Sequence, residues 1–328
     1  MKVLFIGGTG NISTSVSRLA IEQGIDLTLL NRGQRGADIP GTTVIRGDIT
    51  NPPQELRYTS WDAVVNWIVF REEDVRRDIT LFGGRTGQYV FISSASVYQK
   101  PLGYPIVTES TPLANPFWQY SRDKIACEEA LLEAYRASGF PATIVRPAHT
   151  YDTVIPVPIG GGSDYTTVDR IKRGQKIIVH GDGSSLWTVM HATDFAKAFV
   201  GLLGHPRSIG EAFHITSDEI LTWDQILHAV AAAVGTRPQI VHIPSDVLVA
   251  FDEGLRGTLI GDKATSVIFD NTKIKRMVPA FRATVPFHEG IRRTIAWFEA
   301  DPQRQIIRKE TNDFIDAMIH RMESLKTA

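Results

Sequence analysis

The sequence predicts an α/β fold, in which a doubly wound parallel sheet carries a smaller lobe that is mostly C-terminal. Three observations support this prediction. Short apolar runs alternate with stretches of helical periodicity through residues 1–150. A glycine turn at residues 7–10 joins the first apolar run to the first helical stretch. After Arg146 the alternation ends, and glycine and proline become frequent over residues 147–183.

Strands are expected where the apolar runs lie, at 2–6, 26–30, 43–46, 63–69, 88–93 and 142–146. Helices are expected between them, at 13–23, 72–82 and 118–138. Parallel strands need long crossovers, so this repeat favours a Rossmann-type sheet with helices on both faces. Sheets of this kind bind ligands at the carboxyl ends of their strands, and functional residues are expected there.

The composition is that of an ordinary globular protein. The chain has 328 residues, of which 43% are hydrophobic and 22% charged, and its formal net charge is -1. This balance gives no global basic field, so neither nucleic acid nor a membrane is expected as a partner. The single cysteine, Cys127, excludes an intrachain disulfide and a cysteine-rich metal site, and no metal is expected. The sequence shows no signal-peptide pattern and no run of about 20 apolar residues, which predicts a cytoplasmic protein.

The turn after the first strand spans residues 7–13 and reads Gly-Gly-Thr-Gly-Asn-Ile-Ser. Glycine permits a tight turn and lets a pyrophosphate approach the main chain. The helix that follows offers free N–H groups and its positive dipole end. A strand before the motif and a helix after it form the context that a dinucleotide site requires. One position departs from the pattern, because Ser13 stands where a third glycine usually allows close helix packing.

Three further residues form a candidate catalytic group. Tyr120 and Lys124 are four residues apart on the expected helix 118–138, which places both on one face. An ammonium near a phenol favours the phenolate, so the pKa of Tyr120 is expected to be lowered and its hydroxyl to exchange a proton near neutral pH. Ser94 follows the strand 88–93 at its carboxyl end, where its hydroxyl can hydrogen-bond a substrate oxygen.

Together these motifs resemble the extended short-chain dehydrogenase/reductase superfamily, and in particular its NAD-dependent epimerase/dehydratase family. The supporting motifs are Gly47-Asp48-Ile49, the run from Phe91 to Tyr98, Arg146-Pro147, and Gly181-Asp182-Gly183 leading to His191 and Asp194. The resemblance implies that Asp48 approaches the adenine, that Lys124 also holds the nicotinamide ribose, and that the protein is a homodimer. His191, a lone histidine, is expected to be structural. The residues expected to bind the cofactor are Gly7, Thr9, Gly10, Asn11, Ile12, Asn31, Arg32, Arg35, Asp48, Ile49, Ile68, Ser93, Tyr120, Lys124 and Pro147.

The end of the second strand indicates which form of the cofactor is bound. Sites that prefer NAD usually carry an acid about 20 residues past the glycines, bonded to the ribose 2′-hydroxyl. Asn31 takes the place of that acid here, Arg32 follows it, and Arg35 is close by. No carboxylate would repel a 2′-phosphate, and an arginine is available to pair with it. NADP(H) is therefore expected over NAD(H).

The motifs also predict a division of the chain. Residues 1–150 are expected to form an NAD(P)-binding Rossmann domain, to which 185–204 returns. Residues 151–184 and 205–328 are expected to form a substrate-binding lobe with the C-terminal helices. Beyond the glycine-rich region, helices are expected at 194–203, from about 222 and at 287–300, and a strand at 212–216.

Departures from the family pattern reduce the number of reactions that are expected. Sugar 4,6-dehydratases of this family carry an Asp-Glu pair just after the catalytic Ser or Thr, where this chain has Ala95 and Ser96, so elimination is not expected. Nucleotide-sugar epimerases of this family typically hold the diphosphate with an arginine whose place is taken here by Trp187. Tryptophan cannot form that bidentate contact but can stack on a sugar or an aromatic group. A second phosphate-binding arginine of the family is expected near residue 260, where Arg256 and Lys263 are the candidate substitutes. The residues expected to contact a small-molecule substrate are Phe70, Ser96, His149 and Trp187.

The leading hypothesis is therefore an NAD(P)-dependent oxidoreductase that moves a hydride between nicotinamide and a secondary alcohol or ketone. Tyr120 would be its acid/base, Lys124 the electrostatic partner and Ser94 the donor to the carbonyl oxygen. Two alternatives stay open. A nucleotide-sugar or sugar epimerase would pass through a transient keto intermediate. A nucleotide-sensing binding protein without catalysis is suggested by the turn at 31–33 and by 215–218, which resemble the chloroplast stem-loop RNA-binding proteins.

Overall fold

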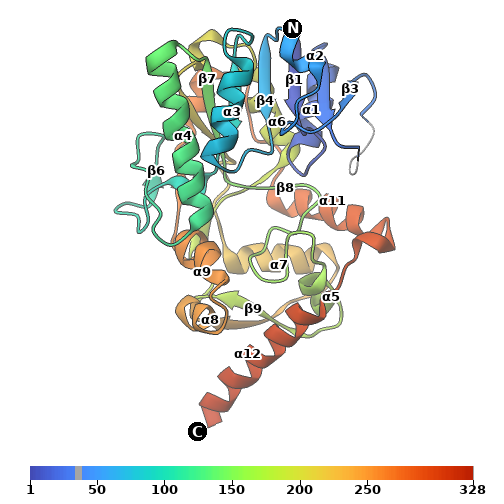
Figure 1. The fold of residues 1–328 in the computed structure, drawn as a ribbon. Helices are drawn as coiled ribbons and strands as arrows, with labels where there is room; N and C mark the ends of the chain where they lie inside the picture. Colours follow the sequence, from blue (N-terminus) through green and yellow to red (C-terminus); the bar gives the residue numbers. More distant parts are fainter. Residues whose placement is uncertain (34–38, 328) are drawn as a thin grey trace.

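The computed structural model describes residues 1–33 and 39–327, and a parallel sheet forms its upper half (Figure 1). In the described residues this sheet has seven strands in the order β12-β7-β5-β4-β1-β2-β3, all of them parallel. The strands are β1 (Lys2–Ile6), β2 (Asp26–Asn31), β3 (Thr43–Arg46), β4 (Ala63–Asn66), β5 (Tyr89–Ile92), β7 (Ala142–Pro147) and β12 (Ala212–Ile215). The predicted Rossmann-type α/β fold is confirmed.

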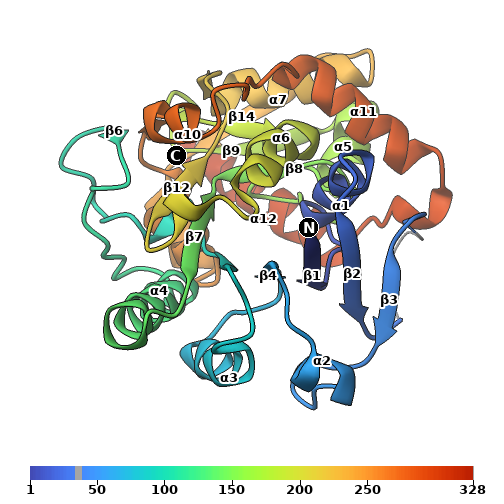
Figure 2. The same ribbon diagram turned by 90° about the horizontal axis from the view of Figure 1, so that it is seen from above.

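Helices cover both faces of the sheet, as the view from above shows (Figure 2). One face carries α1 (Ser13–Glu22), α6 (Ala192–Leu202) and α10 (Thr272–Met277), and the other carries α2 (Gln54–Tyr58), α3 (Glu72–Phe82) and α4 (Gln119–Ser138). Two separate apolar clusters fill the layers, because the strands are buried on both faces and present side chains to each.

The lower lobe packs its own apolar clusters beneath the carboxyl edge of the sheet (Figure 1). Its helices are α5 (Thr166–Lys172), α7 (Trp223–Ala233), α8 (Ser245–Phe251), α9 (Leu255–Thr258), α11 (Phe287–Glu299) and α12 (Lys309–Thr327). Its short strands pair as β8 (His149–Tyr151) with β11 (Val189–His191), β9 (Lys176–His180) with β14 (Gln239–Ile243), β10 (Leu186–Trp187) with β13 (Leu221–Thr222), and β6 (Ile106–Val107) with β15 (Ile268–Phe269). Single turns lie at η1 (Ala95–Val97), η2 (Pro206–Ser208), η4 (Pro302–Arg304) and the π-helical η3 (Leu259–Lys263).

Two elements differ from the sequence prediction. The strand expected at 63–69 ends at Asn66, because the Asn66 side-chain oxygen accepts the N–H of Ile68 and turns the chain out of the sheet. The strand β12 was assigned to the substrate lobe with the rest of 205–328, yet it pairs with β7 at the edge of the main sheet. The segment 185–204 supplies α6, which packs against α1.

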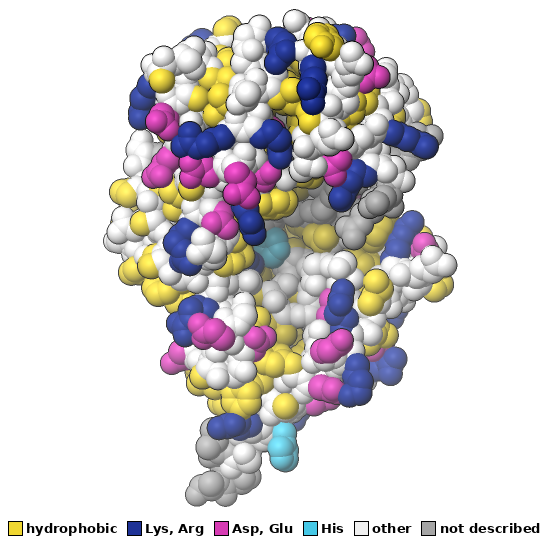
Figure 3. Space-filling model, viewed as in Figure 1, with side chains coloured by type: hydrophobic (Ala, Val, Ile, Leu, Met, Phe, Trp, Pro, Cys, Tyr) yellow, Lys and Arg dark blue, Asp and Glu magenta, His cyan; other side chains and the backbone are white. Residues whose placement is uncertain are grey.

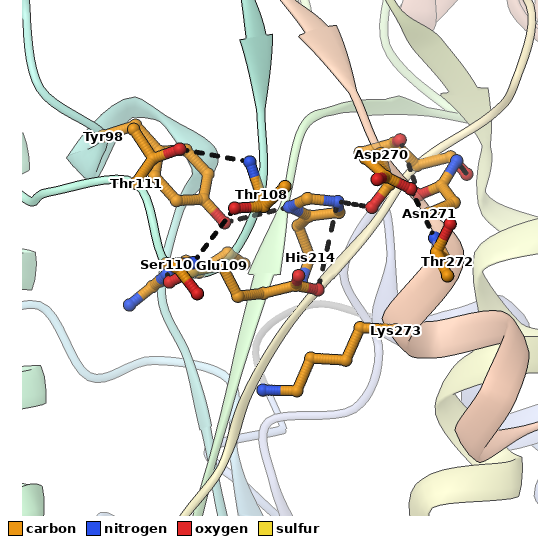
Figure 4. Close-up of polar contacts among 12 residues, drawn as sticks. Tyr98, Thr108, Glu109, Ser110, Thr111, His214, Asp270, Asn271, Thr272 and Lys273 are labelled. Atoms are coloured by element: carbon orange, nitrogen blue, oxygen red, sulfur yellow. Dashed lines mark hydrogen bonds and ion pairs between the residues drawn. The ribbon is translucent and has the colours of Figure 1, made fainter.

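A buried histidine on β12 links this edge strand to two distant segments (Figure 4). The Nδ1 of His214 lies 2.9 Å from the hydroxyl of Tyr98, and its Nε2 lies 2.8 Å from the carbonyl oxygen of Asp270. Its backbone N–H donates to the carboxylate of Glu109. Burial lowers the pKa of His214, so the neutral ring with one donor and one acceptor nitrogen fits these partners.

A buried ion pair joins α4 to the sheet. Arg146 of β7 donates its Nε to the Glu128 carboxylate of α4 at 2.9 Å, and its Nη2 to the second carboxylate oxygen. Both side chains are almost fully buried, at 4% and 1% exposure. The hydroxyl of Ser93, at the end of β5, donates to the same carboxylate. This pair therefore fixes α4 against two neighbouring strand ends.

We expect Glu128→Ala to lower the free energy of unfolding by about 3–5 kcal/mol, because it leaves the Arg146 guanidinium buried without a counter-charge. Urea unfolding monitored by circular dichroism measures the change. Glu129→Ala, an exposed position on the same helix, should stay within about 0.5 kcal/mol of the wild type. Replacing both partners together, Glu128→Leu with Arg146→Met, should recover most of the loss. A single variant as stable as the wild type would contradict this account.

Candidate functional site

The glycine turn between β1 and α1 has the backbone that its sequence requires. Gly7 and Gly8 have φ of +93° and +105°, a region that L side chains rarely adopt. A Cβ on Gly8 would also lie 2.8 Å from the Leu29 side chain. The hydroxyl of Ser13 accepts the N–H of Gly10 at 2.8 Å. The serine in the third glycine position therefore fits and stabilises the turn.

A cavity of about 830 Å³ opens over this turn and runs along the carboxyl ends of β1, β2 and β4. Of the residues predicted to bind the cofactor, Gly7, Thr9, Gly10, Asn11, Ile12, Asn31, Arg32, Asp48, Ile49 and Ile68 line it. Phe70, predicted to contact substrate, lines it as well. Ser93, Tyr120, Lys124 and Pro147 are not among its lining residues. Arg35 lies outside the described residues.

The end of the cavity that is lined by Asn31, Arg32 and Asp48 is polar. The side-chain oxygen of Asn31 accepts the N–H of Gly33, which shapes the turn after β2. The guanidinium of Arg32 is 66% exposed and lies 3.9 Å from the Asp48 carboxylate. Hydrogen bonds from the backbone N–H and hydroxyl of Thr50 lower the pKa of Asp48, with a smaller contribution from Arg32. The Arg32 guanidinium is therefore exposed and only weakly paired.

Lys124 lies behind the cavity, on the face of α4 that packs against the sheet. Its ammonium donates to the carbonyl oxygens of Val69 at 2.6 Å and Ile92 at 2.8 Å, which are at the ends of neighbouring strand segments. It also lies 4.6 Å from the ring centroid of Phe70 and 5.7 Å from that of Tyr120. Burial lowers the pKa of Lys124 to about 8.

Tyr120 and Ser94 are together beside Lys124, at the edge of the cavity where Phe70 lies. The rings of Phe70 and Tyr120 are 6.5 Å apart between centroids. Burial raises the pKa of Tyr120, and a hydrogen bond with Ser94 opposes this only in part. The sequence predicted a lowered pKa from the helical spacing. That expectation is wrong for this structure because the ammonium is directed to carbonyl oxygens and burial of the phenol dominates.

A chain of hydroxyl groups supports Ser94. The hydroxyl of Ser121 donates to that of Ser96 at 2.7 Å, and Ser96 lies 2.9 Å from the hydroxyl of Ser94. Ser96 is thus a buried neighbour of Ser94, although it was predicted to contact substrate. Sequence reasoning missed Ser121 and Glu128. The sequence could have indicated Glu128, because it is a carboxylate within the apolar face of the expected helix 118–138.

The other two predicted substrate residues lie in the lower lobe. Trp187 is 2% exposed, and its ring stacks on Trp223 at 6.0 Å between centroids. His149 is half-buried, and burial lowers its pKa to about 3, so its ring is neutral. His191 caps α6 by accepting the N–H of Thr193. Figure 3 shows that the surface is hollowed between the Rossmann domain and this lobe, with a histidine visible inside the hollow.

The cavity fits a dinucleotide. Its floor is main chain at two positive-φ glycines, the N-cap residue Ile12 has no side-chain bond that would occupy the helix N–H groups, and its far end offers an exposed guanidinium. Among residues 1–33 and 39–327, no cluster of His, Cys, Asp and Glu is arranged to hold a metal ion. Within the same residues no helix is long and apolar enough to span a membrane.

Comparison with known proteins agrees with this arrangement. Residues 80–216 match the family model described as the NAD dependent epimerase/dehydratase family. The chain is 26% identical to the 2'-dehydrokanamycin reductase of Streptomyces kanamyceticus, over 75% of this chain and 70% of that protein. It is 29% identical to the chloroplast stem-loop binding protein of 41 kDa b of Arabidopsis thaliana, over 74% of this chain and 65% of that one.

Solved structures share the fold at low sequence identity. The dTDP-glucose 4,6-dehydratase of Bacillus anthracis, solved in complex with NAD, superposes with a TM-score of 0.71 at 18% identity, over 93% of this chain and 98% of that one. The epimerase Mth375 of Methanothermobacter thermautotrophicus gives 0.72 at 16% identity, over 92% and 93%. At these identities the likeness concerns the fold alone. With the glycine-lined cavity, these comparisons lead to one conclusion: residues 80–216 are similar to the NAD dependent epimerase/dehydratase family, and the chain has the Rossmann-type fold of the solved structures.

Proposed function

We propose that this protein is an NADP(H)-preferring oxidoreductase that moves a hydride between nicotinamide and a secondary alcohol or ketone. One observation carries the proposal. The Ser94, Tyr120 and Lys124 side chains meet at the edge of the glycine-lined cavity, through contacts of Phe70 with both Tyr120 and Lys124. A nucleotide-binding protein without catalysis would not need these three groups to converge there.

Main-chain N–H groups at the start of α1 would hold the diphosphate of the cofactor, with the helix dipole favouring its charge. Arg32 would pair with a 2′-phosphate in place of its long contact to the Asp48 carboxylate, since its guanidinium is exposed at the polar end and Asn31 carries no charge. Asp48, Ile49 and Ile68 would line the rest of this half. A bound nicotinamide would supply or accept the hydride.

Tyr120 would exchange the proton that accompanies the hydride. In ketone reduction its hydroxyl donates a proton to the carbonyl oxygen as hydride reaches the carbon, giving an alcohol and a phenolate that solvent reprotonates. Ser94 would donate a second hydrogen bond to the same oxygen and stabilise the developing charge. The raised pKa of Tyr120 keeps its hydroxyl protonated in this structure, and the protonated form is the one that reduction uses.

Lys124 would keep a positive charge beside the reacting oxygen. Its two carbonyl partners fix the ammonium, and its pKa of about 8 leaves it mostly protonated at neutral pH. The buried Trp187 argues against a nucleotide-sugar substrate, because it occupies the place of a diphosphate-binding arginine. The homodimer implied by the sequence resemblance stays a prediction.

We expect Tyr120→Phe to reduce kcat for ketone reduction by about 10²- to 10⁴-fold, because the proton donor is lost. The rate is followed as loss of NADPH absorbance in a screen of ketones, and NADPH affinity by calorimetry should stay unchanged. Tyr104→Phe, at an exposed tyrosine, is the matched control and should behave as the wild type. Unchanged turnover in Tyr120→Phe would contradict the assigned role. A tightly bound cofactor that is never consumed would instead indicate an epimerase.

We expect Arg32→Ala to weaken NADPH binding by about 10- to 100-fold, the loss of a charge-assisted contact. NADH binding should hardly change, since NADH has no 2′-phosphate. Calorimetric titration of both cofactors measures the ratio. Arg18→Ala, at an exposed arginine on α1, controls for the change in net charge. Equal losses for the two cofactors, or none, would remove Arg32 from the 2′-phosphate site.

We expect the stability of the wild type to rise relative to Lys124→Met by about 2 kcal/mol between pH 8 and pH 10. Burial lowers the pKa of Lys124 from 10.5 to about 8, so between these values the unfolded chain binds more protons than the folded one. Stability therefore increases with pH across this window. Urea unfolding of both proteins at several pH values gives the difference, in which other groups cancel. Parallel pH profiles would show that the ammonium is not desolvated.

A further inference from the structure

The buried ammonium of Lys100 lies outside the group just described. Lys100 is 4% exposed. Among the described residues its ammonium makes one hydrogen bond, a long contact of 3.4 Å to the carbonyl oxygen of Asp262. Burial lowers its pKa, which the Asp262 carboxylate opposes and Lys263 reinforces. A buried charge with so weak a partner is costly for the fold, and methionine would fill the same space without that cost.

A second lysine faces the same aromatic side chain. The ammonium groups of Lys100 and Lys263 lie 5.8 and 5.9 Å from the ring centroid of Trp187. Lys263 pairs with the carboxylate of its neighbour Asp262 at 2.9 Å. The two cations and one anion leave a formal charge of +1, and the positive group without an ion pair is Lys100.

The backbone beneath this charge is held in place. The carbonyl oxygen of Lys263 accepts hydrogen bonds from the Trp223 indole N–H at 3.1 Å and from the Ser185 hydroxyl at 3.4 Å, and it lies 3.1 Å from the Nε2 of His180. Lys263 ends the π-helical turn η3, a geometry that is rare and often found at functional sites. The position of the Lys263 backbone is therefore built into the fold.

The charged cluster of Lys100, Asp262 and Lys263 lies next to the candidate catalytic tyrosine. Lys263 lies 5.9 Å from the ring centroid of Trp118, and the Trp118 and Tyr120 rings are 4.9 Å apart. The Asp262 carboxylate is close enough to Tyr120 to raise the pKa of its phenol. Trp118 and Tyr120 are half-buried while the lysines behind them are buried. The cluster therefore meets the reaction site on the Tyr120 side.

We propose that Lys100 and Lys263 form a subsite, seated on Trp187, for one anionic oxygen group of the substrate, a carboxylate or a phosphate monoester. The inference rests on the proposed function, since it places this group on the molecule that reacts at Tyr120. A single uncompensated positive charge matches one such group. Binding would give the Lys100 ammonium a direct ion pair, which it does not have among residues 1–33 and 39–327.

The test uses the full chain with NADP⁺ added to occupy the glycine turn. Inorganic phosphate and acetate are titrated at constant ionic strength, and tryptophan fluorescence is recorded, because Trp187 and Trp118 lie against the lysines. We expect Lys100→Met to weaken the binding of the preferred anion at least about tenfold, the loss of one charge-assisted hydrogen bond. Lys100→Arg should retain binding. Lys273→Met, at a surface lysine paired with Glu211, should match the wild type.

Thermal unfolding separates binding from folding. We expect Lys100→Met to melt at the wild-type temperature or above it, because an almost unpaired buried charge is removed. The favoured anion should raise the melting temperature of the wild type but not that of Lys100→Met. Tighter binding of phosphate or of acetate identifies the phosphate monoester or the carboxylate as the group recognised. The proposal would be overturned if the wild type and Lys100→Met bound the anion with equal affinity. It would also be overturned if the wild type bound neither anion.

These outcomes are distinguishable from failure of the proposed function. NADPH affinity and Tyr120-dependent ketone reduction are read without either anion. NADPH binding without a Lys100-dependent anion effect would leave the oxidoreductase and remove the subsite. A Lys100-dependent anion effect in a protein that binds no NADPH would leave the subsite and remove the oxidoreductase.

Discussion

Two buried charges one helical turn apart, Lys124 and Glu128, hold α4 against the carboxyl edge of the sheet. The Lys124 ammonium donates to the carbonyl oxygens that follow β4 and end β5, and the Glu128 carboxylate binds Arg146 of β7. Each charge is satisfied by groups on different segments, so the helix cannot slide or rotate without leaving one of them unpaired in the interior. Tyr120 begins the same helix, and its position follows from this attachment.

The lower lobe depends on the same helix from its other end. Trp118, the residue before α4, packs against the segment that contains α9 and η3, where a Cβ on Gly257 would meet its ring. The Asn115 side chain donates to the carbonyl oxygens of Ser96 and Gly261, and so joins the end of β5 to that segment. The cations of η3 and the hydroxyl groups after β5 are thus parts of one packed unit, which explains why Lys100 and Asp262, 162 positions apart, are in contact near Tyr120.

The sequence predicted the elements whose signals are local. Hydrophobic runs gave β1 and β3 their correct bounds, and helical periodicity gave α3 its bounds. Local patterns could not show that the Asn66 side chain would end β4, since that depends on an accepted N–H two residues later. They also could not place β12 at the sheet edge, because its partner β7 is about 70 residues earlier in the chain. The residues lining the cavity followed from strand ends, whereas Lys100 gave no signal because its burial depends on η3 and Trp187.

The helical spacing of Tyr120 and Lys124 shows where a sequence argument for pKa fails. Spacing places the two side chains on one face, but it does not set the direction of the ammonium or the exposure of the phenol. Here the ammonium turns to carbonyl oxygens, Asp262 adds a negative charge near the phenol, and burial disfavours the phenolate further. An anionic group bound at Lys100 would add to the negative potential around Tyr120. Such a substrate would thus raise the pKa of Tyr120 further and favour the protonated phenol from which ketone reduction proceeds.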